Sequence, residues 1–225
     1  MKNVAVILAA GSGSRAGAGL PKQFRCLPDG RTVLETCVAQ FEDCAAIDET
    51  VIVANPKYVA TVQQLMLKCG WQKVNQIITG GNTRAESSLN ALKAIAEKDD
   101  TNVLIHDGAR PFVSQRILND VCKALETHKA VTVAVACTDT IYNTAGEEDL
   151  SLCDIPPRHT LYRAQTPQAF RLTLIKQAFE KLTEQELMQT TDDAGVLHKA
   201  MPDVKILIIK GEETNRKITF KEDLT

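Results

Sequence analysis

A run of small residues follows the first apolar segment of the chain, and two cations come shortly after it. The run reads Ala-Ala-Gly-Ser-Gly over residues 9–13, and the cations are Arg15 and Lys22. Small residues let backbone N–H groups approach phosphate oxygens closely, and Arg and Lys supply the charge that a polyphosphate requires. The segment therefore predicts a phosphate-binding loop. The alternative is an ordinary glycine-rich turn with two solvated cations.

The same loop partly matches a dinucleotide-binding fingerprint. Residues 11–16 have the spacing Gly-x-Gly-x-x-Ala, but that motif needs a helix that begins within the glycines and an acidic residue about 20 positions further on. Gly17, Gly19 and Pro21 oppose such a helix, and the next apolar run ends at Ala54 without a carboxylate. The Gly-Lys-Ser/Thr of a P-loop is absent as well. A nicotinamide-dependent reductase therefore stays only as a competing enzyme class.

An acidic residue, Asp107, follows the apolar run 102–105. This order places it at the carboxyl end of a strand, where ligands bind in open α/β sheets. A Mg²⁺ ion, or another divalent cation, that is bound mainly by a triphosphate needs only one or two protein carboxylates. We therefore predict that Asp107 contacts a metal or a ribose. The alternative is that Asp107 caps the next turn.

Other polar clusters are interpreted as structural. Residues 191–193 read Thr-Asp-Asp and predict a helix N-cap with acidic residues in the first turn. No serine lies in a nucleophile elbow, and no cysteine has a recognised catalytic setting, so hydrolase chemistry has little support. No metal-ligand spacing joins the histidines, which we interpret as structural or solvated: His106, His128, His159 and His198.

The elements that must position these residues alternate along the chain. Short β-branched runs predict strands at residues 4–8, 51–53, 74–78, 103–105, 131–136 and 204–209. Helical spacing predicts helices at residues 33–41, 58–69, 84–96, 115–125 and 172–182. The alternation predicts an α/β fold with a Rossmann-like, mostly parallel sheet flanked by helices. The length, 225 residues, suits a single domain over 1–225.

One segment, about 138–163, interrupts this alternation. It is polar, contains an acidic run at residues 147–149 and carries the pair Pro156-Pro157. Such a length without helical periodicity is too long for an ordinary connection. We therefore expect a disordered loop or a protruding β-hairpin arm that packs on something else.

Composition excludes several classes of partner. Lys plus Arg total 26 against 28 Asp plus Glu, so the net charge is -2 and no global basic field is available to hold a nucleic-acid polymer. The apolar run 4–10 is too short for a membrane span and lacks a signal-peptide cleavage pattern. Seven cysteines without a C-x-x-C pair indicate reduced thiols rather than disulfides or a zinc site. We expect a cytoplasmic protein.

The order of these motifs resembles a known family. The chain is similar to nucleotidyltransferases with a Rossmann-like sheet and, among them, to the 2-C-methyl-D-erythritol 4-phosphate cytidylyltransferases. The landmarks span nearly the whole chain: Ala9-Ala10-Gly11-x-Gly13-x-Arg15, Pro21-Lys22-Gln23, Gly80-Gly81 with Arg84 and Ser87, His106-Asp107-x-Ala109-Arg110-Pro111, Asp139-Thr140, Pro157-Arg158, Thr166-Pro167-Gln168, Thr191-Asp192-Asp193-Ala194 and Asn215-x-Lys217-Ile218-Thr219. The chain differs at Asn82, where some members carry Asp, and at Gly108, where many carry Ala. Ribitol-5-phosphate cytidylyltransferases share most of the pattern, so it indicates the donor more firmly than the acceptor.

The resemblance implies a role for each matching residue. CTP would contact Ala9, Ala10, Gly11, Gly13, Gly81, Asn82, Arg84 and Ser87. Catalysis would depend on Arg15 and Lys22. The polyol-phosphate acceptor would contact Asp107, Arg110 and Lys217, together with Thr140 and Arg158 from the arm of a second subunit, which implies a homodimer. Methylerythritol phosphate is the expected acceptor and ribitol phosphate the alternative. A regulatory module that binds nucleotide without turnover is the alternative of a different class.

Overall fold

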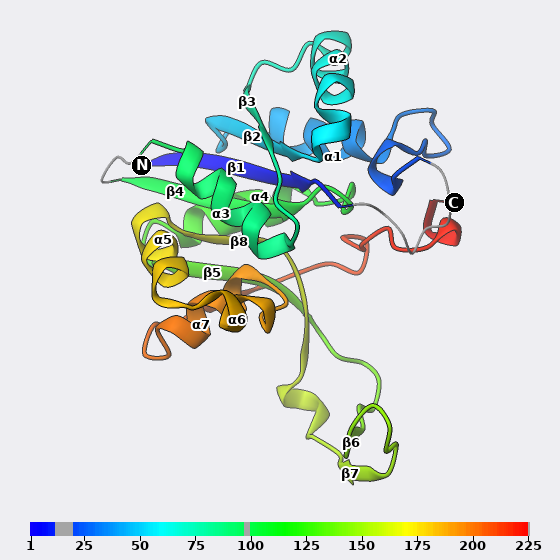
Figure 1. Cartoon of the computed structure of the whole chain (residues 1–225), viewed down its shortest axis with the longest axis vertical. Helices are drawn as coiled ribbons and strands as arrows, with labels where there is room; N and C mark the ends of the chain where they lie inside the picture. Colours follow the sequence, from blue (N-terminus) through cyan, green and yellow to red (C-terminus); the bar gives the residue numbers. More distant parts are fainter. Residues whose placement is uncertain (12–19, 97–99, 225) are drawn as a thin grey trace.

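A seven-stranded sheet forms the centre of the protein (Figure 1). The computed structural model describes residues 1–11, 20–96 and 100–224, and the strand order is β3-β2-β1-β4-β8-β5-β9. The strands are β1 (Lys2–Ala9), β2 (Glu49–Ala54), β3 (Val74–Thr79), β4 (Thr101–Asp107), β5 (Ala130–Ala136), β8 (Tyr162–Arg171) and β9 (Leu207–Lys210). All neighbouring pairs are parallel except those that β8 makes with β4 and β5. The predicted mostly parallel α/β sheet is confirmed.

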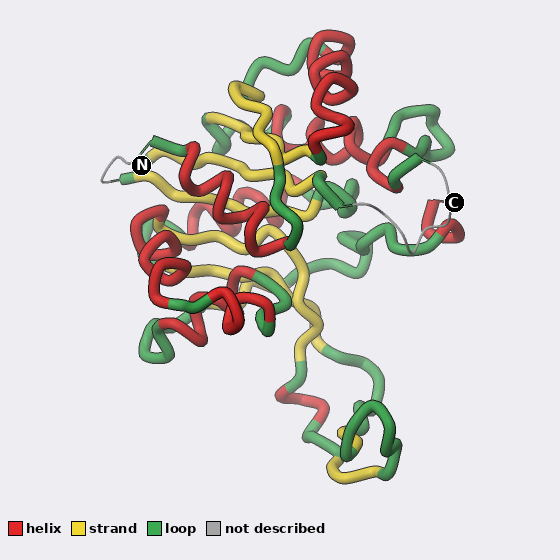
Figure 2. The backbone as a smooth tube through the Cα atoms, viewed as in Figure 1, coloured by secondary structure: helices red, strands yellow, loops and turns green. Residues whose placement is uncertain are grey.

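Helices cover both faces of this sheet (Figure 2). On one face lie α1 (Val33–Glu42), α2 (Val59–Cys69) and α4 (Gln115–Ala124). On the other face lie α3 (Arg84–Ala94), α5 (Leu172–Lys181) and α7 (Asp193–Ala200), with the short α6 (Glu184–Met188) beside them. In β1, Ala5 and Ile7 point to the first face and Val4 and Val6 to the second. This alternation follows from the two-residue period of a strand and explains why β1 is apolar from Val4 onward.

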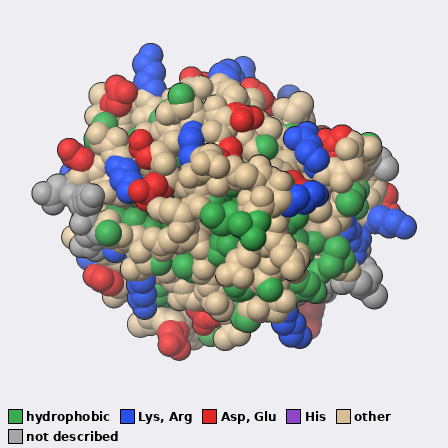
Figure 3. Space-filling view, turned by 90° about the horizontal axis from the view of Figure 1, so that it is seen from above, with side chains coloured by type: hydrophobic (Ala, Val, Ile, Leu, Met, Phe, Trp, Pro, Cys, Tyr) green, Lys and Arg blue, Asp and Glu red, His purple; other side chains and the backbone are tan. Residues whose placement is uncertain are grey.

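Single 3-10 turns occur in the connections. They are η2 (Lys22–Phe24), η3 (Pro56–Tyr58), η4 (Arg158–Thr160) and η5 (Lys221–Leu224). Among the described residues, no helix combines the length and the apolar character needed to cross a lipid bilayer. The face seen from above in Figure 3 carries both cations and anions in a mixed distribution, in keeping with the small net charge.

The predicted strands and helices are all present, with shifted ends. The last strand begins at Leu207 rather than at residue 204. The strand that the sequence did not predict is β8, because residues 165–168 are polar and contain a proline, which is unusual in a central strand. These residues are nevertheless buried. Their polar groups are satisfied by neighbouring segments, which periodicity along the chain cannot reveal.

An arm leaves the sheet between β5 and β8 (Figure 1). It contains the antiparallel pair β6 (Asn143–Thr144) and β7 (Leu152–Asp154), so of the two expected structures the hairpin is observed. Because β5 is parallel to β4 while β8 is antiparallel to both, the arm departs and returns at the edge of the sheet where β4 ends. Its exposed apolar side chains are Ile141, Tyr142, Leu150, Leu152 and Ile155, and Tyr162 at the start of β8 is exposed as well.

Candidate active site

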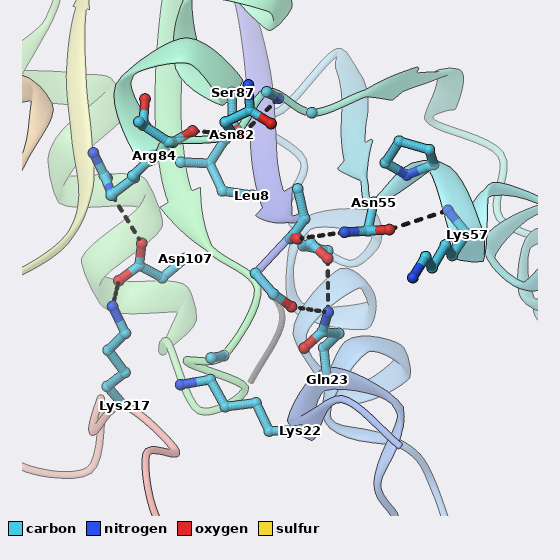
Figure 4. A pocket seen from close by; sticks show the side chains of 18 of the residues that line it. Leu8, Lys22, Gln23, Asn55, Lys57, Asn82, Arg84, Ser87, Asp107 and Lys217 are labelled. Carbon is cyan, nitrogen blue, oxygen red and sulfur yellow. Dashed lines mark hydrogen bonds and ion pairs between the residues drawn. The ribbon is translucent and has the colours of Figure 1, made fainter. Parts of the chain in front are cut away.

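A cavity of about 680 Å³ opens at the carboxyl ends of the first four parallel strands (Figure 4). Its walls come from Leu8 in β1, Asn55 after β2, Gly80 after β3 and Asp107 at the end of β4. This is the edge at which ligands bind in open α/β sheets. Most of the residues predicted for the site line the cavity: Ala9, Ala10, Gly11, Lys22, Gly81, Asn82, Arg84, Ser87, Asp107 and Lys217.

The remaining predicted residues lie elsewhere. Gly13 and Arg15 lie outside the described residues. Arg110 does not line the cavity but packs behind Asp107, and its guanidinium donates to the carbonyl of Asn215 at 2.9 Å. Thr140 and Arg158 are exposed on the arm, away from the cavity of their own chain.

A cluster of ion pairs surrounds Asp107. Its Oδ2 lies 2.8 Å from Lys217 Nζ and 3.7 Å from Arg110 Nε, and its Oδ1 lies 3.4 Å from Arg84 Nε. Burial opposes ionisation of this carboxyl, but Lys217 and Arg84 outweigh that effect and hold its pKa well below the usual range. Asp107 is therefore an anion, and its side chain forms ion pairs instead of the turn cap considered above.

Close backbone approach explains the two glycines after β3. A Cβ on Gly80 would lie 2.4 Å from Ala10 Cβ, and one on Gly81 would lie 2.3 Å from Glu86 Cβ. Real Cβ atoms do not approach this closely, so only glycine fits the observed backbone. The Gly81 N–H donates to Ser87 Oγ at 3.1 Å, which ties this loop to the first turn of α3. The α3 N-terminus therefore faces the cavity with its backbone held in place.

Several lining residues carried no predicted role. Gln23 donates through Nε2 to the carbonyls of Ala9 and Gly11 at 2.8 and 2.9 Å, so it fixes the start of the predicted phosphate-binding loop. It belongs to the Pro-Lys-Gln landmark, which was a usable signal. Asn55 and Lys57 also line the cavity, directly after β2. The rule that ligands bind at strand ends points to them, although no motif singles them out.

The start of α7 lies behind the ion-pair cluster. Asp192 is the N-cap of this helix and accepts from the Gly195 N–H at 2.8 Å, which confirms the predicted cap. The next residue, Asp193, is fully buried and lies 2.8 Å from a guanidinium nitrogen of Arg84. The sequence alone gave no sign of this second contact.

A divalent cation would find one protein carboxylate in the cavity. Asp107 is the acidic residue among the described lining residues, and the described part of the chain holds no cluster of three His, Cys, Asp or Glu that could bind a metal by itself. Both Asp107 oxygens already face cations. This donor set fits Mg²⁺ only as an ion carried mainly by substrate phosphates, which is a common arrangement for that metal.

The buried His106 holds the end of β4 in shape. Its Nδ1 lies 3.0 Å from Thr166 Oγ1 and its Nε2 lies 3.0 Å from the Arg110 carbonyl. Thr166 Oγ1 also accepts from the Asp107 N–H at 3.1 Å, so its own proton goes to His106. This pattern requires a neutral imidazole, and burial lowers the pKa of His106 to about 4. The burial of His106 agrees with its predicted structural role.

We predict that His106 makes stability depend on pH. Its folded pKa is below the ordinary value, so the unfolded chain binds the proton first and stability falls as pH drops below about 6.5. Between pH 7.5 and 5 the wild type should lose about 2 kcal/mol that His106→Gln does not lose. Urea unfolding at both pH values measures this difference. The exposed His128→Gln is the control and should follow the wild type; equal losses in wild type and His106→Gln would contradict the prediction.

Comparison with known proteins places the chain in a family. The family model for 2-C-methyl-D-erythritol 4-phosphate cytidylyltransferase matches residues 3–225. A protein of that name from Halalkalibacterium halodurans is 40% identical over 225 residues, which cover 100% of this chain and 94% of the relative. The bifunctional ribulose 5-phosphate reductase/CDP-ribitol pyrophosphorylase Bcs1 of Haemophilus influenzae is 37% identical over 224 residues, 99% of this chain but only 47% of the relative. The chain thus spans about half of that protein.

A solved structure gives the same result. The crystal structure of 4-diphosphocytidyl-2C-methyl-D-erythritol synthase from Anaerococcus prevotii superimposes with a TM-score of 0.81 at 31% identity, covering 99% of this chain and 94% of the other. The family model, the relatives and this structure agree over nearly the full length. The chain belongs to the 2-C-methyl-D-erythritol 4-phosphate cytidylyltransferase family.

Proposed function

We propose that the protein transfers CMP from CTP to 2-C-methyl-D-erythritol 4-phosphate, giving 4-diphosphocytidyl-2-C-methyl-D-erythritol and pyrophosphate. Membership of the family supports this function. The single structural observation that carries it is the cation cluster around Asp107, which lies in the same cavity as Lys22 and the start of the phosphate-binding loop. A cavity built this way can hold two phosphorylated substrates side by side.

The reaction is an in-line displacement at phosphorus. An oxygen of the acceptor phosphate forms a bond to the α-phosphorus of CTP, and the bond from that phosphorus to the bridging oxygen of pyrophosphate breaks. The nucleophile is already an anion, so the protein mainly has to neutralise repulsion and align the two groups. Lys22 serves the triphosphate, and the three cations Arg84, Arg110 and Lys217 outnumber the two nearby acidic side chains, Asp107 and Asp193. The excess positive charge favours the acceptor phosphate.

Mg²⁺ or another divalent cation is part of this proposal. The triphosphate would carry it, with Asp107 as the protein's carboxylate ligand. When bound, the cation would neutralise part of the negative charge on the phosphate oxygens during the displacement.

Ribitol 5-phosphate is the second candidate acceptor. The Haemophilus relative, whose name includes CDP-ribitol pyrophosphorylase, is 37% identical to this chain. Both acceptors end in a phosphate dianion, so Lys217 and a bidentate Arg recognise what they share. Discrimination then depends on hydroxyl count and the branched methyl, which are typically worth only about 1 to 3 kcal/mol. Some cross-reactivity is expected.

A substrate panel tests the proposed function. CTP and UTP are each combined with methylerythritol phosphate and with ribitol phosphate, and products and pyrophosphate are measured. We expect CTP with methylerythritol phosphate to give the highest kcat/KM. A higher kcat/KM with ribitol phosphate would exclude the proposed acceptor while the cytidylyltransferase activity stands. Nucleotide binding without pyrophosphate release would indicate a regulatory module instead, and NAD(P)H turnover a reductase.

Lys22→Ala should lower turnover strongly. Lys22 lines the cavity beside the loop that receives the triphosphate, where charge grows during the displacement. Losing such a preorganised group costs on the order of 100-fold in kcat, and the same loss is predicted for Arg15→Ala. Steady-state kinetics, with circular dichroism to verify the fold, measures the effect. Lys93→Ala, on the exposed side of α3, is the control; near-normal turnover of Lys22→Ala would exclude the assigned role.

We also propose that the protein is one domain whose arm makes it a homodimer. The arm exposes apolar side chains such as Tyr142 and Leu150, and such a cluster on an extended hairpin suits burial against another chain. Thr140 and Arg158 are exposed on the same arm and do not reach their own cavity. In a two-fold dimer each arm could complete the acceptor site of the neighbour.

Mixing two inactive variants tests this dimer. Lys217→Ala removes a residue of the cavity and Arg158→Ala a residue of the arm, so each homodimer should be nearly inactive. A mixed dimer has one complete site, and mixing after partial dissociation should restore about a quarter of wild-type activity. Light scattering reports the oligomeric state. A fully active monomer, or no recovery in a verified mixed dimer, would overturn the proposal; Lys217→Ala mixed with itself is the control.

We place the enzyme in the cytoplasm. All seven cysteines are unpaired, and free thiols persist in a reducing compartment. With its small net charge, the chain offers no basis for binding a nucleic-acid polymer. The proposed partners are therefore the two substrates and a second copy of the chain.

A further inference from the structure

Asp193 is a fully buried carboxylate that lies outside the cavity lining. It does not cap its own helix, since Asp192 does so. Its side chain instead lies 2.8 Å from Nη1 of Arg84, which starts α3 and lines the cavity. Burial raises the pKa of Asp193, and the Arg84 guanidinium opposes that shift, so the contact stabilises the carboxylate and fixes one end of the guanidinium.

Arg84 is shared between two carboxylates. Its Nη1 lies 2.8 Å from Asp193 Oδ2, whereas its Nε lies 3.4 Å from Asp107 Oδ1. Figure 4 marks the second pair with a dashed line. The fork of a guanidinium can face two partners, and the shorter contact dominates. Asp193 therefore draws Arg84 back from Asp107.

This arrangement leaves the Asp107 carboxylate with a single short ion pair. Its one short contact is with Lys217 at 2.8 Å, while Arg84 and Arg110 lie at 3.4 and 3.7 Å, beyond the usual length of a charged hydrogen bond. Among the described residues, Asp107 would be the remaining ion-pair partner of Arg84 if Asp193 were removed. A closer pair between these two groups would make both less available to a ligand in the cavity.

The position of Asp193 is itself rigid. Gln168 in β8 accepts through Oε1 from the N–H groups of Asp193 and Ala194 at 2.9 and 3.0 Å, and it donates through Nε2 to Asp192 at 2.7 Å. Gln168 pairs with Ile105 in β4, two residues before Asp107. The two carboxylates that share Arg84 are thus fixed to adjacent strands of one sheet.

We propose that Asp193 is a positioning residue that holds Arg84 off Asp107 and so keeps both available to the acceptor substrate. This inference rests on the proposed CMP transfer, because the acceptor is defined by that reaction. Asp193 acts through Arg84 and does not touch the substrate. Arg84 was expected to contact CTP, but its ion pair with Asp107 indicates the acceptor end of the cavity. Loss of Asp193 should therefore change use of the acceptor more than binding of CTP.

The test compares Asp193→Asn, Arg84→Gln and the double variant in the full-length protein. Asp193→Asn should lower kcat/KM for methylerythritol phosphate about 10-fold or more, with the CTP dissociation constant changed less than about twofold. The double variant should lose no more activity than Arg84→Gln alone, since both changes break one interaction. Its Tm should exceed that of Arg84→Gln, which leaves the buried Asp193 without its cationic partner. Asp203→Asn, at an exposed position after α7, is the matched control and should keep wild-type kinetics.

The outcomes separate this inference from the proposed function. A wild type without CMP transfer would overturn both. An active wild type with an equally active Asp193→Asn, or a double variant at least tenfold below Arg84→Gln, would overturn the positioning role alone. If Asp193→Asn does not fold, the activity of the double variant is compared with that of Arg84→Gln instead. The double variant buries a neutral pair of side chains.

Discussion

One buried carboxylate, Asp107, organises the site and much of the chain around it. A charge removed from water is tolerated only when partners compensate for the lost hydration. Here the partners of the carboxylate come from distant segments: Lys217 near the end of the chain and Arg84 at the start of α3. The backbone N–H of Asp107 donates separately to the Thr166 hydroxyl. The segment that carries Lys217 is held in turn, because the Ile218 N–H donates to the Ala109 carbonyl and the Ile218 side chain is fully buried.

The direction of β8 connects the fold with the proposed assembly. Because β8 runs antiparallel between β4 and β5, its first residues lie at the edge of the sheet where Asp107 lies. The arm before it therefore projects from the active-site edge and not from the opposite one. A parallel strand in this place would have required a crossover to the far edge of the sheet. The same strand brings Thr166 and Gln168 behind Asp107, so one topological choice serves both the arm and the site.

The charge of this protein is arranged locally. The chain as a whole is slightly acidic, yet the cavity gathers Lys22, Arg84 and Lys217 around one carboxylate. Local cations close to a partly enclosed cavity act strongly on a bound phosphate, because little water screens them. A protein can therefore bind polyphosphates without the basic surface that a nucleic-acid polymer needs.

The sequence by itself determined the alternation of strands and helices and the location of Asp107 at a strand end, because local periodicity and motif spacing encode these features. It also determined the cap at Asp192, which depends on residues three positions apart. Only the tertiary structure decided the course of β8, the contact of Asp193 with Arg84 and the anchoring role of Gln23. Each of these depends on polar side chains that are buried against segments far away in the chain. Such residues have the composition of a loop until the fold supplies their partners, since burial and hydrogen bonding are properties of neighbours in space and not of neighbours in sequence.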